Sequence, residues 1–341
     1  MPGTTGDQYR LTEEQKAFWM EHGFLKIPRC FSRDTAKKFT HSVWTRLGAD
    51  PEDKSTWPTE KINMPGHTIV PVADFAPKAW SAMCELVGGE DKVADWVQNW
   101  KDGFIVNFGK PEFKPEDELD YRTLDNWHND GDFFVHFLDS PEQALLVIPL
   151  FTDIMPKGGG TVICTDGIGL VAKRLYDHPD GMTPFMAPRG TPELQGEARR
   201  EFWNGVIRNP ELTRAETFYE ATGEIGDVYL LHPFMLHSAS RNLLRNVRII
   251  TNPPVALKEP FNYNRKDPSE YSLVEKKTLK DLGRPEGLPE WKITSPRENL
   301  VPARVHKQAE MKIQELERLK KTGVPVTLYE GAKAHDIFYP S

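Results

Sequence analysis

The chain has 341 residues, of which 43 are Lys or Arg and 50 are Asp or Glu, so its formal net charge is -7. With 38% hydrophobic residues, it is long and apolar enough to bury a sizeable core. The chain has no long basic run, and nucleic-acid affinity depends mostly on clustered Lys and Arg. We therefore expect no nucleic-acid partner.

Cysteine usage and the N-terminal residues indicate where the protein works. Cys30, Cys84 and Cys164 lie far apart and form no CxxC pair, which predicts neither a disulfide framework nor a thiolate zinc site. Residues 1–9 contain no apolar signal-peptide core, and no long uncharged apolar run follows. We expect a cytoplasmic protein without membrane contact, acting as a monomer or homodimer.

The first third of the sequence is typical of helices. The spacing Thr-x-x-Gln from Thr12 predicts a capping box, and Gly23 is a suitable helix end. Further helices are expected over 32–48 and 77–87, where apolar residues recur at helical spacing. Residues 11–100 are thus predicted to form a helical N-terminal layer.

The middle of the chain changes to short β-branched and aromatic segments separated by Gly, Pro and Asp, which indicates a β-sandwich or barrel. A long stretch at 176–226, with a short helix predicted over 193–206, interrupts this core of residues 102–255. The predicted strands are 104–108, 133–137, 144–151, 161–164, 228–231 and 247–251.

Residues 256–341 are expected to form a helical C-terminal extension, with helices over 268–282 and 303–321. In the second of these, Ala309, Ile313 and Leu316 form a narrow apolar stripe.

Two histidines stand two residues before an aspartate. His178 and Asp180 lie in Asp-His-Pro-Asp-Gly, which is typical of an exposed turn. His128 and Asp130 are followed by a predicted strand, and residues i and i+2 of extended backbone project from the same face. These two side chains can therefore lean toward one metal ion.

A third ligand must come from elsewhere, and His232 and His237 at the end of a predicted strand are both candidates. Two His and one carboxylate form the ligand set typical of non-haem Fe(II) oxygenases, which leaves coordination positions open. A zinc or structural ion could use the same residues, although zinc sites more often contain three His or Cys.

Arg248 favours iron. It follows His237 by 248 - 237 = 11 residues, in a strand where it faces opposite to its neighbours Val247 and Ile249. A buried guanidinium needs an anion, and its fork suits a carboxylate such as the distal one of 2-oxoglutarate. An acidic core residue could fill the same role.

Taken together, the motifs resemble those of the phytanoyl-CoA dioxygenase family, in family order over roughly residues 11–255. The residues that carry the resemblance are Leu11 to Gln15, His22-Gly23-Phe24, His128-x-Asp130, Gly158-Gly159-Gly160-Thr161, Gly226-Asp227, His232-Pro233-x-x-x-His237, Asn242 and Arg248.

This resemblance implies a mainly β fold with flanking helices and a double-stranded β-helix (jelly-roll, cupin-like) core. It implies that His128, Asp130 and His237 hold Fe(II), that Arg248 anchors 2-oxoglutarate, and that His232 is a supporting residue. The expected protein is a 2-oxoglutarate-dependent dioxygenase that consumes O2 and gives succinate and CO2. Because the ligands span 237 - 128 = 109 residues, we expect residues 1–341 to form one domain.

The chain departs from the family pattern two residues after His237, where a hydroxyl residue that helps to hold the cosubstrate is replaced by Ala239. Ser238 or Ser240 could supply that hydroxyl, and Asn107 and Lys110 are further candidate contacts to the 2-oxo acid.

The expected reaction is hydroxylation of an unactivated C–H bond in a small organic molecule, with desaturation, epoxidation or ring closure open. Acyl derivatives, amino acids and intermediates of secondary metabolism are the expected substrates, and Asp130 makes halogenation unfavourable. A catalytically inactive barrel that binds a small ligand, or a zinc-dependent hydrolase, is the alternative. Aromatic residues suggest an apolar pocket wall: Trp127, Phe133, Phe134, Phe137, Phe338 and Tyr339.

Overall fold

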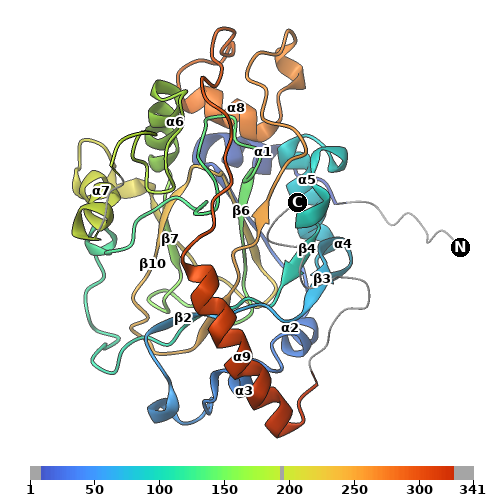
Figure 1. The fold of residues 1–341 in the computed structure, drawn as a ribbon, viewed down its shortest axis with the longest axis vertical. Coiled ribbons are helices and arrows are strands. Elements are labelled where there is room, and N and C mark those ends of the chain that lie inside the picture. The colour runs from blue at the N-terminus through green and yellow to red at the C-terminus, as the bar shows by residue number, and fades with distance from the viewer. Residues whose placement is uncertain (1–8, 193–195, 326–341) are drawn as a thin grey trace, which may run out of the picture.

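The computed structural model describes residues 9–192 and 196–325 of the chain (Figure 1). Its centre consists of two antiparallel sheets. The first has the strand order β1 (Phe24–Ile27), β9 (Val228–Leu231), β6 (Leu145–Pro149), β12 (Pro254–Val255). The second has the order β10 (Leu236–Ala239), β7 (Thr161–Cys164), β8 (Phe218–Ala221).

The chain alternates between these sheets, because β6 and β9 lie in the first and the strands that follow them, β7 and β10, lie in the second. A further sheet has the order β11 (Arg248–Ile250), β5 (Ile105–Asn107), β2 (Lys61–Asn63). An isolated bridge pairs Leu150 with Ile250, and it continues the antiparallel register that pairs Leu146 with Pro254. The segment 248–255 therefore runs along β6 and joins the further sheet to the first.

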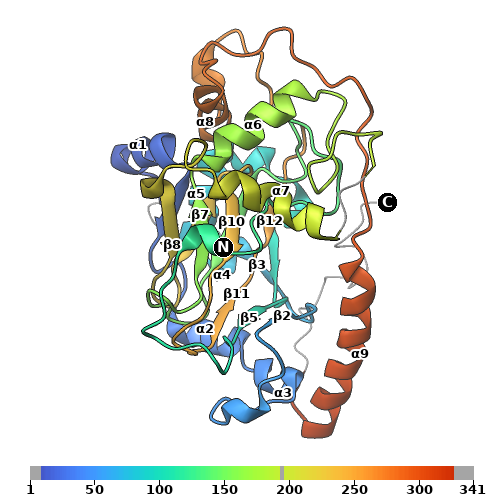
Figure 2. The same cartoon turned by 90° about the vertical axis from the view of Figure 1, so that its left-hand side faces the viewer.

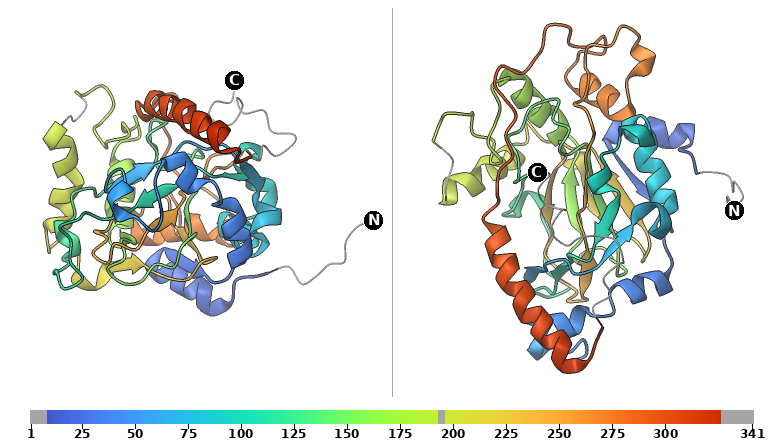
Figure 3. Two further views of the ribbon diagram at one scale, coloured as in Figure 1. Left: turned by 90° about the horizontal axis from the view of Figure 1, so that it is seen from below. Right: turned by 45° about the vertical axis from the view of Figure 1, so that its right-hand side comes forward.

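Helices surround the sheets, and Figures 2 and 3 show them on several sides of the β structure. A two-stranded ribbon of β3 (Ile69–Pro71) and β4 (Asn99–Lys101) lies among them. No helix within the described residues is long and apolar enough to cross a membrane. The helices are α1 (Glu13–His22), α2 (Arg33–Phe39), α3 (Val43–Leu47), α4 (Val72–Phe75), α5 (Pro77–Val87), α6 (Gly167–Asp177), α7 (Gly196–Arg208), α8 (Leu273–Asp281) and α9 (Arg304–Thr322).

Local signals placed several elements correctly. Thr12 forms the predicted capping box of α1, and Gly23 ends that helix with a left-handed φ of 68°. The helix over 77–87 and the strand over 161–164 are confirmed at both ends. The helix expected over 32–48 is instead divided into α2 and α3, where the Thr40 hydroxyl donates to the Ala36 carbonyl and the chain turns.

The strand predicted over 133–137 is wrong. The chain bends at Gly131, which has a φ of 116°, and Phe134 and His136 form only isolated bridges to residues 299 and 182. Aromatic residues are enriched in strands because they pack well on a half-buried surface. In residues 133–137 the aromatic side chains pack in the same way, but from a loop.

The predicted boundaries of the layers also change. Residues 11–100 contain strands as well as helices, and β1 is part of the first sheet. The stretch 176–226 contains β8, which pairs with β7 along its full length and so belongs to the core. Strand β8 has only four residues, with the sequence FYEA, which is too short to show a clear alternation of apolar and polar residues.

Helix α9, at the lower front of Figure 1, is held by buried charges. Glu315 is 2% exposed, and its Oε2 lies 2.8 Å from Nε of Arg46 and 2.7 Å from Nε2 of His67. Arg46 also pairs with Asp102 at 3.0 Å. The predicted apolar stripe is wrong in its orientation, since Ile313 is 62% exposed and Glu315 and Leu319 face inward.

Candidate metal and cosubstrate site

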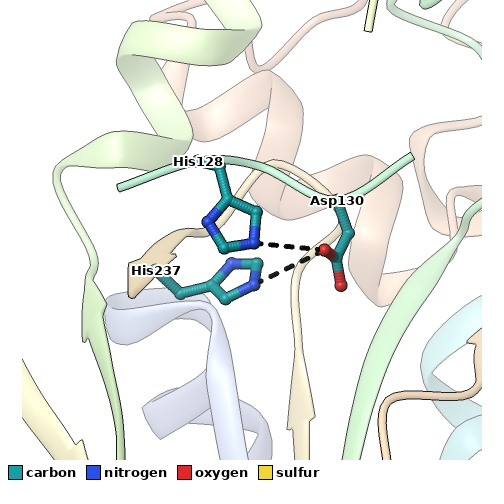
Figure 4. Close-up of side chains that lie close together, drawn as sticks. All are labelled: His128, Asp130 and His237. Carbon is teal, nitrogen blue, oxygen red and sulfur yellow. Dashed lines mark ion pairs between the residues drawn. The ribbon is translucent and has the colours of Figure 1, made fainter. Parts of the chain in front are cut away.

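Three predicted side chains meet at one point. Nε2 of His128 lies 3.4 Å from Oδ1 of Asp130, and Nε2 of His237 lies 3.7 Å from the same oxygen (Figure 4). The ligand atoms of the three residues all lie within 4.8 Å of one another. Two donors at about 2.1 Å from one ion and at a right angle are about 3 Å apart, so the cluster fits a metal ion.

Backbone pairing places the two imidazoles side by side. His128 N–H donates to the His237 carbonyl at 3.0 Å, and His237 N–H donates to the His128 carbonyl at 2.9 Å. This single bridge extends the edge of the second sheet beyond β10, and it sets the ring centroids 4.3 Å apart. His128 and Asp130 therefore approach one point, as expected, but the backbone there is held by the bridge to His237 and not by a strand that follows Asp130.

The tautomers of both rings are fixed by backbone carbonyls. Nδ1 of His128 donates to the Asn126 carbonyl at 2.7 Å, and Nδ1 of His237 donates to the Met235 carbonyl at 3.0 Å. A carbonyl can only accept, so in each neutral ring the lone pair is on Nε2, which faces Asp130. Both rings are thus oriented to bind a cation.

The pKa values of all three residues in the cluster are shifted. Burial lowers the pKa of His237 to about 4, with a contribution from the charge of His128. Burial also acts to lower the pKa of His128, but the hydrogen bond and charge of Asp130 outweigh it and the pKa is raised. The two histidines likewise outweigh the burial of Asp130 and lower the pKa of its carboxyl group. Asp130 is therefore anionic and His237 neutral at neutral pH.

Sequence reasoning missed one partner of the cluster. Nδ2 of Asn252 donates to Oδ2 of Asp130 at 3.2 Å, which leaves Oδ1 directed to the two imidazoles. Asn252 lies just beyond β11, four residues after Arg248, and only the register of that strand against β6 could have indicated its position.

The three residues line a cavity of about 1610 Å³, and Arg248 lines the same cavity. Arg248 is 2% exposed, and burial lowers its pKa to about 10. Its Nε donates to the Gly159 carbonyl at 2.9 Å and its Nη1 to the Ile105 carbonyl at 3.4 Å. Within residues 9–192 and 196–325 it forms no ion pair with a carboxylate, so a buried cation here faces a space that can hold an anion.

Asn107 supports the walls of the site rather than lining it. It lies opposite Arg248 in the ladder, and opposite Lys61 on its other side. Its Nδ2 donates to the Ser240 carbonyl at 3.0 Å and to the Gly159 carbonyl at 3.4 Å, while its Oδ1 accepts from Gly109 N–H. The structure therefore uses Asn107 to join β5 to the turns that flank the second sheet.

Three other predicted contacts also lie off the cavity wall. Lys110 is half exposed and lies 3.6 Å from Glu60. Ser238 is buried and, by strand alternation, faces away from His237 and Ala239. The Ser240 hydroxyl is buried with no hydrogen-bond partner among the described residues. The residue opposite Ala239 in the ladder is Thr161, which does line the cavity and presents a hydroxyl there.

The remaining candidates separate clearly. His232 is fully buried 2.9 Å from the Thr278 hydroxyl on α8 and does not join the cluster. His178 and Asp180 form the predicted turn. Trp127 and Phe133 line the cavity, whereas Phe134 and Phe137 are buried elsewhere. Phe338 and Tyr339 lie outside the described residues.

No protein-family model matches the sequence, and no curated protein matches it either. Among solved structures, HygX from Streptomyces hygroscopicus with nickel and 2-oxoglutarate bound is 14% identical, over 73% of this chain and 88% of HygX, with a TM-score of 0.40. SnoK, a non-haem α-ketoglutarate-dependent carbocyclase from nogalamycin biosynthesis, is 16% identical over 85% of this chain and 97% of SnoK, with a TM-score of 0.39. EctD from S. alaskensis with 2-oxoglutarate and 5-hydroxyectoine is 14% identical over 73% of this chain and 77% of EctD, with a TM-score of 0.38. At these TM-scores the similarity assigns no function, which has to come from the site itself.

Proposed function

We propose that the protein is an Fe(II)- and 2-oxoglutarate-dependent oxygenase that acts on a small organic molecule. One observation carries the proposal: a cluster of two His and one carboxylate shares a cavity with a buried arginine that has no acidic partner within the described residues. Two His and one carboxylate with open positions suit non-haem Fe(II). The alternation of the chain between two antiparallel sheets supports a double-stranded β-helix of the phytanoyl-CoA dioxygenase type.

Each residue has a defined task in this proposal. His128 and His237 hold Fe(II) through Nε2 and Asp130 through Oδ1, while Asn252 holds the second carboxylate oxygen in place. Arg248 binds the distal carboxylate of 2-oxoglutarate with the donor positions that the Gly159 and Ile105 carbonyls do not use. The bound iron and cosubstrate, with O2, supply an oxidant for an unactivated C–H bond and give succinate and CO2.

The rest of the cavity binds substrate and excludes water. Apolar side chains of β6 and β11 lie on its wall beside the metal cluster, which keeps the reacting C–H bond in a dry environment. The apolar wall residues include Trp127, Phe133, Leu146, Ile148 and Ile250.

Anaerobic titration tests the proposal. Fe(II) and 2-oxoglutarate together should give a visible charge-transfer band with the wild-type protein, and admission of air should give iron-dependent succinate. The His128→Ala variant should show neither signal, whereas His178→Ala, which alters the turn histidine, should keep both. A zinc-dependent hydrolase or an inactive binding protein is favoured instead if the wild-type protein shows no band and no iron-dependent succinate.

A further inference from the structure

The insertion 176–226 contributes a buried amide to the loop that carries His128. Asn204 lies on α7, at the left of Figure 1, and is 1% exposed. Its Oδ1 accepts from Trp127 N–H at 3.2 Å, and its Nδ2 donates to the Asp125 carbonyl at 3.0 Å. A backbone N–H can only donate and a carbonyl can only accept, so these two partners fix the orientation of the side-chain amide. Both ends of the amide are thus engaged by one short backbone segment.

The peptide unit held by Asn204 is the one that orients His128. Trp127 N–H and the Asn126 carbonyl belong to the same planar peptide bond. The N–H donates to Oδ1 of Asn204, while the carbonyl accepts from Nδ1 of His128 at 2.7 Å. Hydrogen bonds in series polarise one another, and a rigid plane that is fixed at one end is fixed at the other. Asn204 therefore determines where the carbonyl that holds the imidazole points.

The ring of His128 depends strongly on this hydrogen bond. The side chain of His128 is 37% exposed, compared with 8% for His237. Surrounding side chains therefore restrain the ring of His128 less than that of His237. Nδ1 of His237 is held by the Met235 carbonyl, which Asn204 does not contact. Any effect of Asn204 should thus appear at one of the two histidines and not at the other.

The insertion also reaches the cavity itself. Trp203, the residue before Asn204 on α7, is buried and lines the cavity. The insertion therefore contacts both the space for the substrate and the backbone of a proposed metal ligand.

Another buried group of the insertion has no contact with the metal loop. Thr213 follows α7 and is fully buried, and its hydroxyl donates to the Ile207 carbonyl at 2.8 Å. This hydrogen bond stabilises the end of α7 without involving the peptide between Asn126 and Trp127. Thr213→Val is therefore a matched control for changes that only loosen the insertion.

We propose that Asn204 is a positioning residue for metal binding, which acts through the peptide bond between Asn126 and Trp127 to hold Nε2 of His128 toward the metal site. The insertion is then part of the metal centre as well as a wall of the cavity. This inference rests on the proposed function for the identity of the metal. The orientation of the ring, however, can be measured in the metal-free protein, and Co(II) or Zn(II) can replace iron as a probe.

The first test follows the ring nitrogens of the metal-free protein, labelled with 15N-histidine, by NMR. Asn204→Ala should shift the Nδ1 resonance of His128, because the Asn126 carbonyl is no longer held, and should leave that of His237 in place. Asn204→Leu, which nearly keeps the volume of the side chain, should have the same effect. Thr213→Val should shift neither resonance. A general loosening of the fold would instead affect both histidines.

Metal affinity shows whether this orientation matters for binding. Asn204→Ala and Asn204→Leu should each weaken Co(II) binding by about fivefold to tenfold, at or just below the roughly 10-fold to 100-fold effect of groups that contact a ligand directly. Thr213→Val should bind Co(II) as the wild-type protein does. Titration followed by the Co(II) absorption spectrum measures the affinity of each variant.

A measurement on the wild-type protein covers the case in which the Asn204 variants do not fold. Binding of Zn(II), a diamagnetic probe, should shift the side-chain amide resonances of Asn204, because charge on the imidazole strengthens the chain of hydrogen bonds that ends there. The side-chain amide of Asn209, whose Oδ1 accepts from Glu211 N–H beyond α7, should not move.

The proposal is overturned if the Asn204 variants keep the His128 resonance or the wild-type Co(II) affinity, or if Thr213→Val reproduces their effects. It is also overturned if Zn(II) leaves the amide of Asn204 unmoved. A wild-type protein that binds neither Co(II) nor Zn(II) contradicts both this inference and the proposed function. A protein that shows the expected effects of Asn204 but gives no iron-dependent succinate contradicts the proposed function alone.

Discussion

Arg304 and Asp132 form a two-point ion pair, in which Nε lies 2.6 Å from Oδ2 and Nη2 lies 2.7 Å from Oδ1. Asp132 follows Asp130, a proposed metal ligand, by two residues, and Arg304 is the first residue of α9. The helix that forms one cavity wall is thereby attached to the loop that carries His128 and Asp130, two of the three proposed metal ligands.

The two attachments of α9 should differ strongly in energy. Glu315 is buried, and Glu315→Ala leaves Arg46 with one anionic partner, so we expect a loss of about 3 to 5 kcal/mol in unfolding free energy. Arg304→Ala breaks a pair whose side chains are 39% and 36% exposed, and after screening by solvent it should cost less than about 1 kcal/mol. Urea unfolding measures both, and equal losses would contradict this ranking.

Asn252 should act on metal affinity through Asp130. Asn252→Ala removes the donor to Oδ2, and we expect Co(II) or Fe(II) affinity to fall about 10-fold to 100-fold, as for other groups that orient a ligand. Asn252→Asp places a second carboxylate beside Asp130 and should not restore the wild-type affinity. Metal titration followed by the Co(II) absorption spectrum checks this. Unchanged affinity in Asn252→Ala would show that Asp130 is positioned without it.

Arg248 should govern cosubstrate affinity and leave metal binding intact. Arg248→Met removes a buried charge-assisted contact, so 2-oxoglutarate affinity should fall by about 30-fold or more, corresponding to about 2 kcal/mol. Arg248→Lys keeps the charge but not the fork and should give an intermediate value. Calorimetry of 2-oxoglutarate binding to the Co(II)-loaded protein measures this, and Lys110→Met is the control, because Lys110 lies off the cavity wall.

Acid should destabilise the metal-free fold through its buried neutral histidines. Burial lowers the pKa of His232 well below its usual value and that of His136 to about 4. The unfolded chain takes up protons at these positions below about pH 6.5 while the folded protein does not, so stability falls as the pH drops. The raised pKa of His128 acts in the opposite direction.

The measurement is urea unfolding of the metal-free protein at about pH 7 and about pH 5. Each buried neutral histidine should contribute about 2 kcal/mol to the loss between these values. His232→Gln should therefore lose about 2 kcal/mol less than the wild-type protein over this range. His41→Gln, at an exposed position, serves as the control. A pH dependence unchanged by His232→Gln would refute the assignment.

The sequence predicts best what depends on neighbouring residues. Thr12 and Gly23 bound α1 because caps are local, and the alternation of β10 places His237 toward the cavity. The cluster itself was predictable from His128-x-Asp130 together with the family resemblance, which selected His237 over His232.

Packing between distant segments was not predictable. Glu315 breaks the apolar pattern of α9, yet it is buried because Arg46 pairs with it and His67 lies within hydrogen-bond distance, both more than 240 residues earlier in the chain. Asn107 was predicted as a contact to the 2-oxo acid and lies opposite Arg248 in the ladder, but its amide is bound by turns whose positions depend on the other sheet. The role of Asn252 likewise depends on strand register.

The position of α9 on the cavity wall bears on how much of the chain is needed for selective catalysis. A fragment that ends near Leu300 would keep α8 and every proposed metal and cosubstrate ligand. It would, however, lose Glu315, leave Arg46 with Asp102 as its one acidic partner, and open the cavity to bulk water on the side that α9 lines. Under the proposed function, such a fragment should consume 2-oxoglutarate without directing the oxidant to a chosen substrate, so α9 is the element through which we expect substrate choice to be set.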